Sequence, residues 1–287
     1  TGANGVTIIG NATGGGAANA YGAYNVGAGT LTINGAVTGG SATDACGAWN
    51  AGAGTITING NVTGGSATYA HGAWNASTGT LTIYGNVTCG AGSAYGAINA
   101  STGTLTITGD VTGGAGSAYG AYNVGAGVVT ITGAVTGGSA TGAHGAYNNG
   151  TGTMTVTGNV TGGSVANAHG AWNQTGGTLT ITGAVTGGSA TNAHGAWNAS
   201  TGAITINGTV AASSTARAFG VYNNSTGVIT VIGSLVDTEQ CGAYYGPIYW
   251  QPVAGVHYHK VFYSAGAARY YSPSPADSDV RFGTFAG

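Results

Sequence analysis

The sequence predicts an all-β protein built as a parallel β-solenoid, and three observations support this fold class. Apolar residues alternate with threonines, as in Leu31 and Ile33, which is the period of a strand. Glycine is very frequent, at 60 of 287 residues, and separates the alternating segments. A unit of 24 or 25 residues recurs about ten times, with copies that begin at Asn4, Gly29, Gly54, Gly79, Gly103, Gly127, Gly152, Gly177, Gly202 and Gly227.

Each unit is expected to form one coil with three short strands. In the second copy these are residues 30–34, 36–38 and 45–50, separated by Gly35, by residues 39–41 and by the turn at 51–53. One unit cannot bury its own apolar face, so each strand should pair in parallel with its equivalent in the next coil. Ten coils at about 4.8 Å each predict a rod roughly 48 Å long.

The third strand contains the aromatic residues of the repeat, and comparison of the copies predicts their direction. Its first position varies widely, from Asp44 to Tyr69 to Arg217, as expected of a solvent-facing site. Alternation from that site points Ala45, Gly47 and Trp49 inward, which predicts a core aromatic ladder that includes Trp49, Trp74, Trp172 and Trp197. The opposite direction would bury the more polar column that contains Cys46, His71, His144, His169 and His194.

An unbroken column of asparagines ends the third strand. Stacked side-chain amides can hydrogen-bond from coil to coil and hold a tight turn, so we expect a structural role for this column. Its members are Asn25, Asn50, Asn75, Asn99, Asn123, Asn148, Asn173, Asn198 and Asn223.

The chain carries very little charge, with four Lys and Arg and six Asp and Glu in total. It therefore lacks the clustered basic residues that nucleic acids and anionic membranes require, and we expect neither as a partner. No apolar run approaches the length of a membrane span, so membrane insertion is not expected. The chain begins at Thr1 without an initiator Met or a signal peptide, which suggests a processed or truncated protein.

The three cysteines, Cys46, Cys89 and Cys241, lie in different coils. Their odd number and separation offer no disulfide framework and no paired metal-binding motif. We interpret them as small fillers of repeat positions.

The repeats end near Ser234, which predicts an array over residues 1–235 and a distinct segment over 236–287. Solenoid ends expose strand edges and core, so this Tyr-rich segment is expected to cap its own chain or to pair with a neighbouring subunit. Residues 279–285 alternate like a strand that could be donated to another copy. The candidate assembly residues are Tyr244, Tyr245, Tyr249, Trp250, Tyr270 and Tyr271.

The repeats lack the grouped carboxylates of polysaccharide-cleaving enzymes, because Asp44 and Asp110 are isolated. Asp237 and Glu239 form one close pair, which we interpret as a solvated end of the array. We therefore expect no catalytic residues and no cofactor.

Histidines raise the question of a metal. His257 and His259 alternate without a third ligand nearby, and we interpret them as part of a surface strand. His144, His169 and His194 should stack about 4.8 Å apart, where protonated rings would repel one another. No metal site is assigned, and modest acid sensitivity is expected if this column is exposed.

Thr-x-Thr pairs recur on the outer face of the first strand, and the pattern lapses at Val128, Ala203 and Val228. These arrays resemble those of insect and other solenoid ice-binding proteins, and the resemblance implies ordering of surface water. Carbohydrate binding by exposed aromatic residues is a second alternative, which requires an outward-facing Trp column. The pairs are Thr30/Thr32, Thr55/Thr57, Thr80/Thr82, Thr104/Thr106, Thr153/Thr155 and Thr178/Thr180.

Over residues 4–235 the coils resemble the Gly/Thr/Asn-rich β-solenoid repeats of bacterial extracellular adhesins and surface filaments, and of some phage fibres. The resemblance implies a non-enzymatic structural protein at the cell surface or outside the cell. We expect a filament subunit or rigid shaft that assembles end to end with copies of itself, with surface glycans as a further class of partner. An ice-binding or glycan-binding solenoid and a phage fibre segment are the alternatives.

Overall fold

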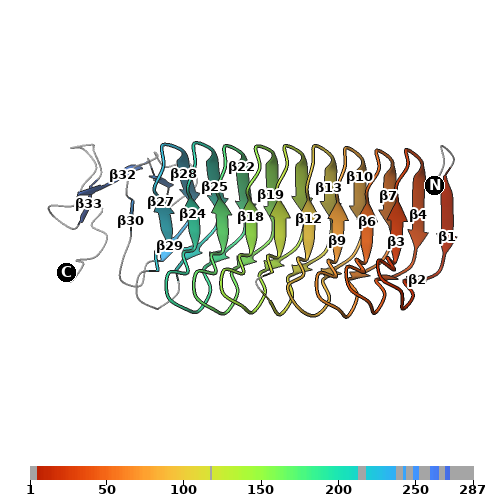
Figure 1. The fold of residues 1–287 in the computed structure, drawn as a ribbon. Coiled ribbons are helices and arrows are strands. Elements are labelled where there is room, and N and C mark those ends of the chain that lie inside the picture. Colours follow the sequence, from red (N-terminus) through yellow and green to blue (C-terminus); the bar gives the residue numbers. More distant parts are fainter. Residues whose placement is uncertain are drawn as a thin grey trace.

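The computed structural model describes residues 5–116, 118–212, 218–236, 242–243, 248–251, 259–264 and 269–271. It confirms the predicted parallel β-solenoid, in which the copies of 24 or 25 residues stack as successive coils along one axis (Figure 1). The described residues contain nine sets of three strands, from β1–β3 to β25–β27, and β28–β30 follow as a tenth set. None of the described residues forms a helix long and apolar enough to cross a bilayer.

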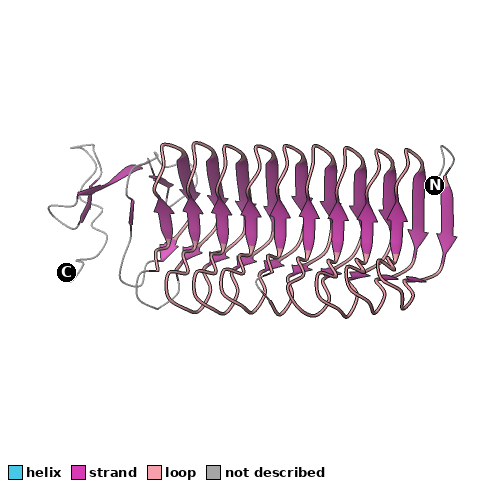
Figure 2. Ribbon diagram, viewed as in Figure 1, coloured by secondary structure: helices cyan, strands magenta, loops and turns pink. Residues whose placement is uncertain are grey.

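The strands form three sheets that run along the coils, joined by short loops (Figure 2). The first sheet comprises β1 (Val6–Ile9), β4 (Thr30–Asn34), β7 (Thr55–Ile58), β10 (Thr80–Ile83), β13 (Thr104–Ile107), β16 (Val128–Ile131), β19 (Thr153–Thr157), β22 (Thr178–Thr182), β25 (Ala203–Asn207), β28 (Val228–Ile232), β31 (Ile248–Gln251), β32 (His259–Ser264) and β33 (Arg269–Tyr271). The second comprises β2 (Ala12–Thr13), β5 (Val37–Thr38), β8 (Val62–Thr63), β11 (Val87–Thr88), β14 (Val111–Thr112), β17 (Val135–Thr136), β20 (Val160–Thr161), β23 (Val185–Thr186), β26 (Val210–Ala211) and β29 (Leu235–Val236). The third comprises β3 (Ala23–Asn25), β6 (Ala48–Asn50), β9 (Ala73–Asn75), β12 (Ala97–Asn99), β15 (Ala121–Asn123), β18 (Ala146–Asn148), β21 (Ala171–Asn173), β24 (Ala196–Asn198), β27 (Val221–Asn223) and β30 (Gly242–Ala243).

Equivalent residues pair with each other in successive coils. Leu31 pairs with Ile56 and Ile33 with Ile58, and the same parallel register holds from β1 to β28. The apolar residues of β4 and β5 point inward, and Ile33 and Val37 are fully buried. From β4 to β27, each coil contributes two such residues from its first strand, a Val from its second and an Ala or Val from its third. The core is therefore a set of aliphatic columns.

The predicted direction of the third strand is wrong. The strand begins at Ala48, not Ala45, because the chain turns at Asp44, whose φ of 61° places it in the left-handed region. Both Ala45 and Cys46 are buried, at 0% and 1% exposure, so alternation does not extend across this segment. Within the strand, Ala48 and Asn50 point into the core and Trp49 points away from it.

Trp49, Trp74, Trp172 and Trp197 are accordingly half-buried on the outer side of the third sheet and are not part of the aliphatic core. The small alanines that precede them fill the narrow space inside the coil. A row of indoles would not fit there beside the Leu, Ile and Val columns of the facing sheets, since protein cores are close-packed.

The asparagine column is fully buried and binds coil to coil. The Asn75 amide Nδ2 donates to the Gly79 carbonyl at 3.0 Å and to Asn99 Oδ1 at 3.1 Å. The first bond closes the turn after the third strand, and the second connects adjacent coils. The amide-to-amide bonds join Asn50, Asn75, Asn99, Asn123, Asn148, Asn173 and Asn198 in sequence.

The Gly-Gly pair after the second strand allows adjacent coils to approach. A Cβ atom on Gly65 would lie 1.9 Å from the Gly40 carbonyl oxygen, and one on Gly64 would lie 2.0 Å from the Ala70 carbonyl oxygen. Neither contact is sterically possible without moving backbone. Glycine therefore suits this close approach of the coils, and where Cys89 and Ala212 replace the first glycine of the pair the local backbone must differ.

Replacing Asn75 by Ala should lower the free energy of unfolding by about 2 to 4 kcal/mol, because it leaves the Gly79 carbonyl unpaired, removes the acceptor of Asn50 and creates a small cavity. Chemical denaturation followed by circular dichroism would measure this loss. Asn59→Ala is the matched control, since Asn59 is an exposed asparagine directly after β7 whose amide donates to the exposed Asn34, and its loss should stay within about 0.5 kcal/mol. Equal effects of the two substitutions would contradict a special role of the buried column.

Candidate functional site

Acidic residues of the repeats hold the backbone and do not form a catalytic pair. The Asp110 carboxylate accepts a hydrogen bond from the Ala134 amide at 2.8 Å, and Asn86 and Asn159 accept equivalent bonds from the next coil. Asp44 occupies the left-handed turn position that Asn167 fills in a later coil. No group of three His, Cys, Asp or Glu side chains able to hold a metal ion occurs in the described ranges.

The two described cysteines are buried and protonated at neutral pH. Burial raises the pKa of Cys46 and that of Cys89 to about 12, so both stay as thiols at neutral pH. The Cys89 thiol donates to the Thr112 carbonyl at 3.5 Å. Since the thiolate is the nucleophilic form, neither side chain is set up for covalent chemistry. Cys241 lies outside the described residues.

The outer face of the first sheet carries one threonine column without interruption. Its members pair in register through ten coils: Thr7, Thr32, Thr57, Thr82, Thr106, Thr130, Thr155, Thr180, Thr205 and Thr230. The lapses at Val128, Ala203 and Val228 all fall in the neighbouring column that starts at Thr30. β-Branched side chains are stiff, so this sheet presents a regular lattice of hydroxyl and methyl groups.

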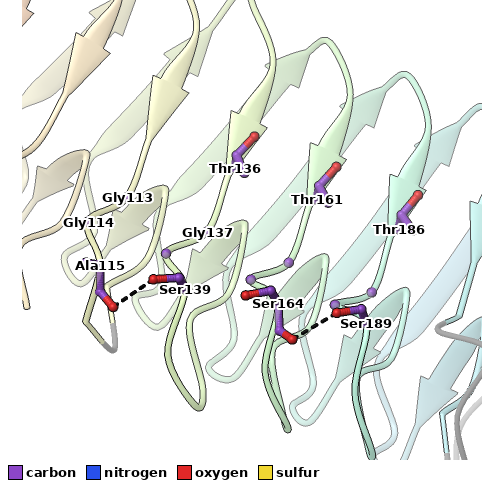
Figure 3. Close-up of a pocket in the computed structure, with 15 residues that line it drawn as sticks. Gly113, Gly114, Ala115, Thr136, Gly137, Ser139, Thr161, Ser164, Thr186 and Ser189 are labelled. Atoms are coloured by element: carbon purple, nitrogen blue, oxygen red, sulfur yellow. Dashed lines mark hydrogen bonds between the residues drawn. The ribbon is translucent and has the colours of Figure 1, made fainter.

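A shallow groove follows the second sheet where the Gly-Gly pairs lie. One stretch of about 670 Å³ spans the coils from Gly113 to Ser189, and a stretch of about 640 Å³ occupies the same position in the first coils. Figure 3 shows Thr136, Thr161 and Thr186 along the strands and the serines on the opposite side. The groove is uncharged over both stretches.

Serine hydroxyls of this groove are used in coil stacking. Ser139 Oγ donates to the Ala115 carbonyl at 2.9 Å, and Ser189 Oγ donates to the Ser164 carbonyl at 2.8 Å (Figure 3). No histidine or acid lines the groove beside these serines, so no base is present to activate them. The groove is therefore an uncharged surface of small residues, and its serines lack the neighbouring base of a serine-hydrolase site.

Two aromatic ladders run beside each other along the third sheet. The inner ladder stacks His71, Tyr95, Tyr119, His144, His169, His194 and Phe219, one ring per coil. The outer ladder contains Trp49 and Trp74, and after a gap at Ile98 it continues through Tyr122, Tyr147, Trp172 and Trp197. Rings of the two ladders meet edge to face, as between His169 and Trp197 at 4.9 Å and 82°.

Histidines of the inner ladder are buried, and the expectation of an exposed column is therefore wrong. His144, His169 and His194 are 3%, 2% and 6% exposed because the outer ladder covers them. Their rings stack 4.8 Å apart, as the coil spacing predicted. Sequence reasoning missed this burial because it placed the outer aromatic residues inside the coil.

The backbone fixes the tautomer of these histidines. The amide N–H of His169 donates to His144 Nδ1 at 3.1 Å, that of His194 donates to His169 Nδ1 at 3.1 Å, and that of Phe219 donates to His194 Nδ1 at 3.1 Å. A nitrogen that accepts a hydrogen bond carries no proton, so in each neutral ring the proton lies on Nε2. Because Nε2 then has no lone pair to offer, this arrangement disfavours metal coordination by the trio.

Burial keeps the rings neutral. It lowers the pKa of His71 to about 4, that of His144 to about 3 and that of His194 to about 4. The pKa of His169 lies well below its ordinary value because of burial, and its neighbours His144 and His194 lower it further. All four imidazoles are uncharged at neutral pH.

The outer ladder faces away from the core but hides its ring faces. Trp172 and Trp197 stack at 4.7 Å and 5°, and Tyr147 covers the other face of Trp172 at 4.5 Å and 11°. Stacking of sugars on aromatic side chains needs an open ring face. The Trp side chains therefore point outward, as carbohydrate binding by this column requires, but their ring faces are not open to a sugar.

The polar atoms of the outer ladder depend on one position of the following coil. Trp197 Nε1 donates to Asn224 Oδ1 at 3.0 Å, and Tyr147 Oη donates to Gln174 Oε1. Trp49 and Trp172 face Ala76 and Ala199 at the equivalent sites, and their enclosed Nε1 atoms have no partner among the described residues. Which residue of the following coil faces each Trp or Tyr of the outer ladder can be identified in the sequence only once the strand register is known.

The candidate assembly residues fall at the end of the described chain. Tyr249 and Trp250 lie in β31, which pairs in parallel with β28, and Tyr270 and Tyr271 lie in β33, which pairs antiparallel with β32. His259 begins β32. Tyr244, Tyr245, Asp237, Glu239 and His257 lie outside the described residues, as does the strand-like segment 279–285.

Acidification should destabilise the protein between about pH 6.5 and about pH 3, because the unfolded chain binds protons that the buried histidines cannot accept. Stability is complete above the unfolded pKa, and each histidine should withdraw on the order of 2 kcal/mol near the lower limit. Urea denaturation across this range would measure the slope. The variant H144F/H169F/H194F, which copies the phenylalanine found at Phe219 in the same column, should leave only the contribution of His71. If the free energy of unfolding changed as steeply with pH in that variant as in the unchanged protein, the buried histidines would not be the cause of the pH dependence.

Ala199→Asn should stabilise the protein by about 1 kcal/mol, because the new amide can accept from Trp172 Nε1 as Asn224 does from Trp197. Thermal unfolding followed by tryptophan fluorescence would record the gain. Ala51→Asn is the matched control, since its aromatic neighbour Tyr24 is exposed and can bind water. A stabilisation as large in the control would mean that the buried indole is not the cause.

Each of these surfaces is a column of equivalent residues that continues through several coils. Comparison with protein-family models, with curated proteins and with solved structures finds no match for this chain.

Proposed function

We propose that this protein is an extracellular, non-enzymatic structural rod, a filament subunit or appendage shaft that assembles end to end with copies of itself by continued β-pairing. One observation supports this most directly. All three sheets repeat the same parallel register from coil to coil, so the contact that holds two coils of one chain is also suited to hold coils of two chains.

The first described coil has the strand edge that such a contact between two chains would use. Among the described residues β1 pairs only with β4, and Ile9 in β1 is 88% exposed. A strand that joins β1 on its other side, from the same chain or from another copy, would meet the pairing pattern that already connects the coils. Exposed strand edges of this kind are templates for association.

The sides of the rod support a structural role in a different way. They carry almost no charge, and their polar groups are largely threonine, serine and asparagine. The Asp110 carboxylate, the Cys89 thiol and the Nδ1 atoms of the stacked histidines make hydrogen bonds between coils. The extracellular location rests on the resemblance of the coils to the repeats of bacterial adhesins and surface filaments.

A second candidate function is ice binding, which the unbroken column from Thr7 to Thr230 favours. Ten stiff, in-register threonines on one sheet provide a regular array of hydroxyl and methyl groups. Such an array can order a layer of water whether or not the rods assemble end to end.

Electron microscopy of the protein at neutral pH should reveal fibres with an axial repeat near one subunit length. Ile9→Lys should shorten or abolish them, because a charge at the edge strand opposes further pairing. Thr132→Lys is the matched control, as Thr132 also follows a core isoleucine but lies on the side of a central coil, and its fibres should persist. Dispersed rods without fibres would reject the filament proposal, and an ice-recrystallisation assay would then test the threonine face.

A further inference from the structure

A cavity of about 510 Å³ lies along the buried histidines of the inner ladder. It is lined by His144, His169 and His194 on one side, by Trp172 and Trp197 of the outer ladder, and by loop residues that include Asn167 and Asn192. Asn167 and Asn192 occupy left-handed turn positions, with φ of 59° and 58°. The cavity extends over three coils and therefore has the shape of a short trough parallel to the rod axis.

Three hydrogen-bond donors point into this trough. Each histidine uses Nδ1 to accept a backbone N–H, which leaves the proton on Nε2, the ring nitrogen farther from the main chain. Within the described part of the chain no acceptor contacts these Nε2 atoms, yet they are not enclosed in the way that Trp172 Nε1 is. They therefore reach the cavity, and the ring stacking spaces them by 4.8 Å.

Packing does not require histidine at these positions. Tyr119 and Phe219 occupy the same column with similar ring stacking. After Tyr119, the backbone amide of His144 donates to the Gly142 carbonyl instead of to a ring nitrogen. Three consecutive histidines thus add oriented N–H donors that the fold can do without.

We propose that this trough binds a neutral, extended polysaccharide that lies along the rod axis, with one sugar residue per coil. The Nε2–H groups donate to hydroxyl or ether oxygens of successive sugars. The amides of Asn167 and Asn192 supply further donors and acceptors at the rim. The edges of Trp172 and Trp197 provide the apolar wall, so recognition does not depend on an open aromatic face.

Charge and spacing select this class of ligand. The lining contains no Lys, Arg, Asp or Glu, and a carboxylate or phosphate would lose its hydration there without a cation to replace it. A peptide strand advances about 3.3 Å per residue, so its carbonyls would fall out of step with donors 4.8 Å apart. A β-1,4-linked pyranose unit is close to one coil in length and stays in step over three coils.

The test uses cellohexaose and chitohexaose as neutral probes and a galacturonate hexamer as the charged comparison. At least one neutral hexamer should bind in calorimetry at neutral pH, and long-range proton–nitrogen spectra should show the three Nε2–H signals shifting as it binds. The galacturonate hexamer should bind at least about tenfold more weakly, and so should a disaccharide, because it spans fewer donors.

Substitutions then locate the site. H144F/H169F/H194F, or His169→Phe alone if the triple variant is unstable, should weaken binding by about tenfold or more. S139A/S164A/S189A is the matched control, because it alters the separate groove of Figure 3 at positions where Ala115 already occurs, and its affinity should be unchanged. The proposal fails if neither neutral hexamer binds, if the Nε2–H signals do not move, or if binding survives the histidine substitutions.

Discussion

Stacking of identical residues on one another is the constraint from which the rest of this structure follows. In a parallel, in-register solenoid every side chain has its own equivalent about 4.8 Å above and below it. A residue type is therefore tolerated only if it packs well against itself. Aliphatic columns satisfy this in the core, and the asparagine column satisfies it with amide-to-amide hydrogen bonds. The Gly-Gly pairs satisfy it by removing the side chain where backbones approach too closely.

The same constraint explains the near absence of charge. Two like charges at the coil spacing repel by about 1 kcal/mol in water and by several times more where the surroundings are less polar. A charged column would add this penalty at every coil. Asp110 avoids it because asparagine or alanine occupies the same column in neighbouring coils, and Asp44 because asparagine and tyrosine do. Neutral histidines stack where protonated ones could not.

Much of the architecture was predictable because it depends on periodicity. The repeat length, the inward direction of Leu31 and Ile33, and the position of the asparagine column all follow from comparing copies of one unit. The third strand was not predictable in the same way. Its alternation is interrupted by the left-handed turn at Asp44, whose conformation has no clear signal when Tyr69 or Gly142 fills the equivalent position. Because the direction of that strand was predicted wrongly, the burial of His144, the outward direction of Trp172 and the trough between them were not predicted.

The amide ladder also gives the rod a direction. From Asn50 through to Asn198, each link runs from Nδ2 in one coil to Oδ1 in the next, so one end of such a stack offers donors and the other offers acceptors. Two such ends match only head to tail, because a twofold-symmetric contact would oppose donor to donor at one kind of end and acceptor to acceptor at the other. Contacts of the head-to-tail kind do not close on themselves unless they rotate into a ring. A molecule organised in this way has a built-in polarity, and any assembly that continues its ladders must grow with one end distinguishable from the other.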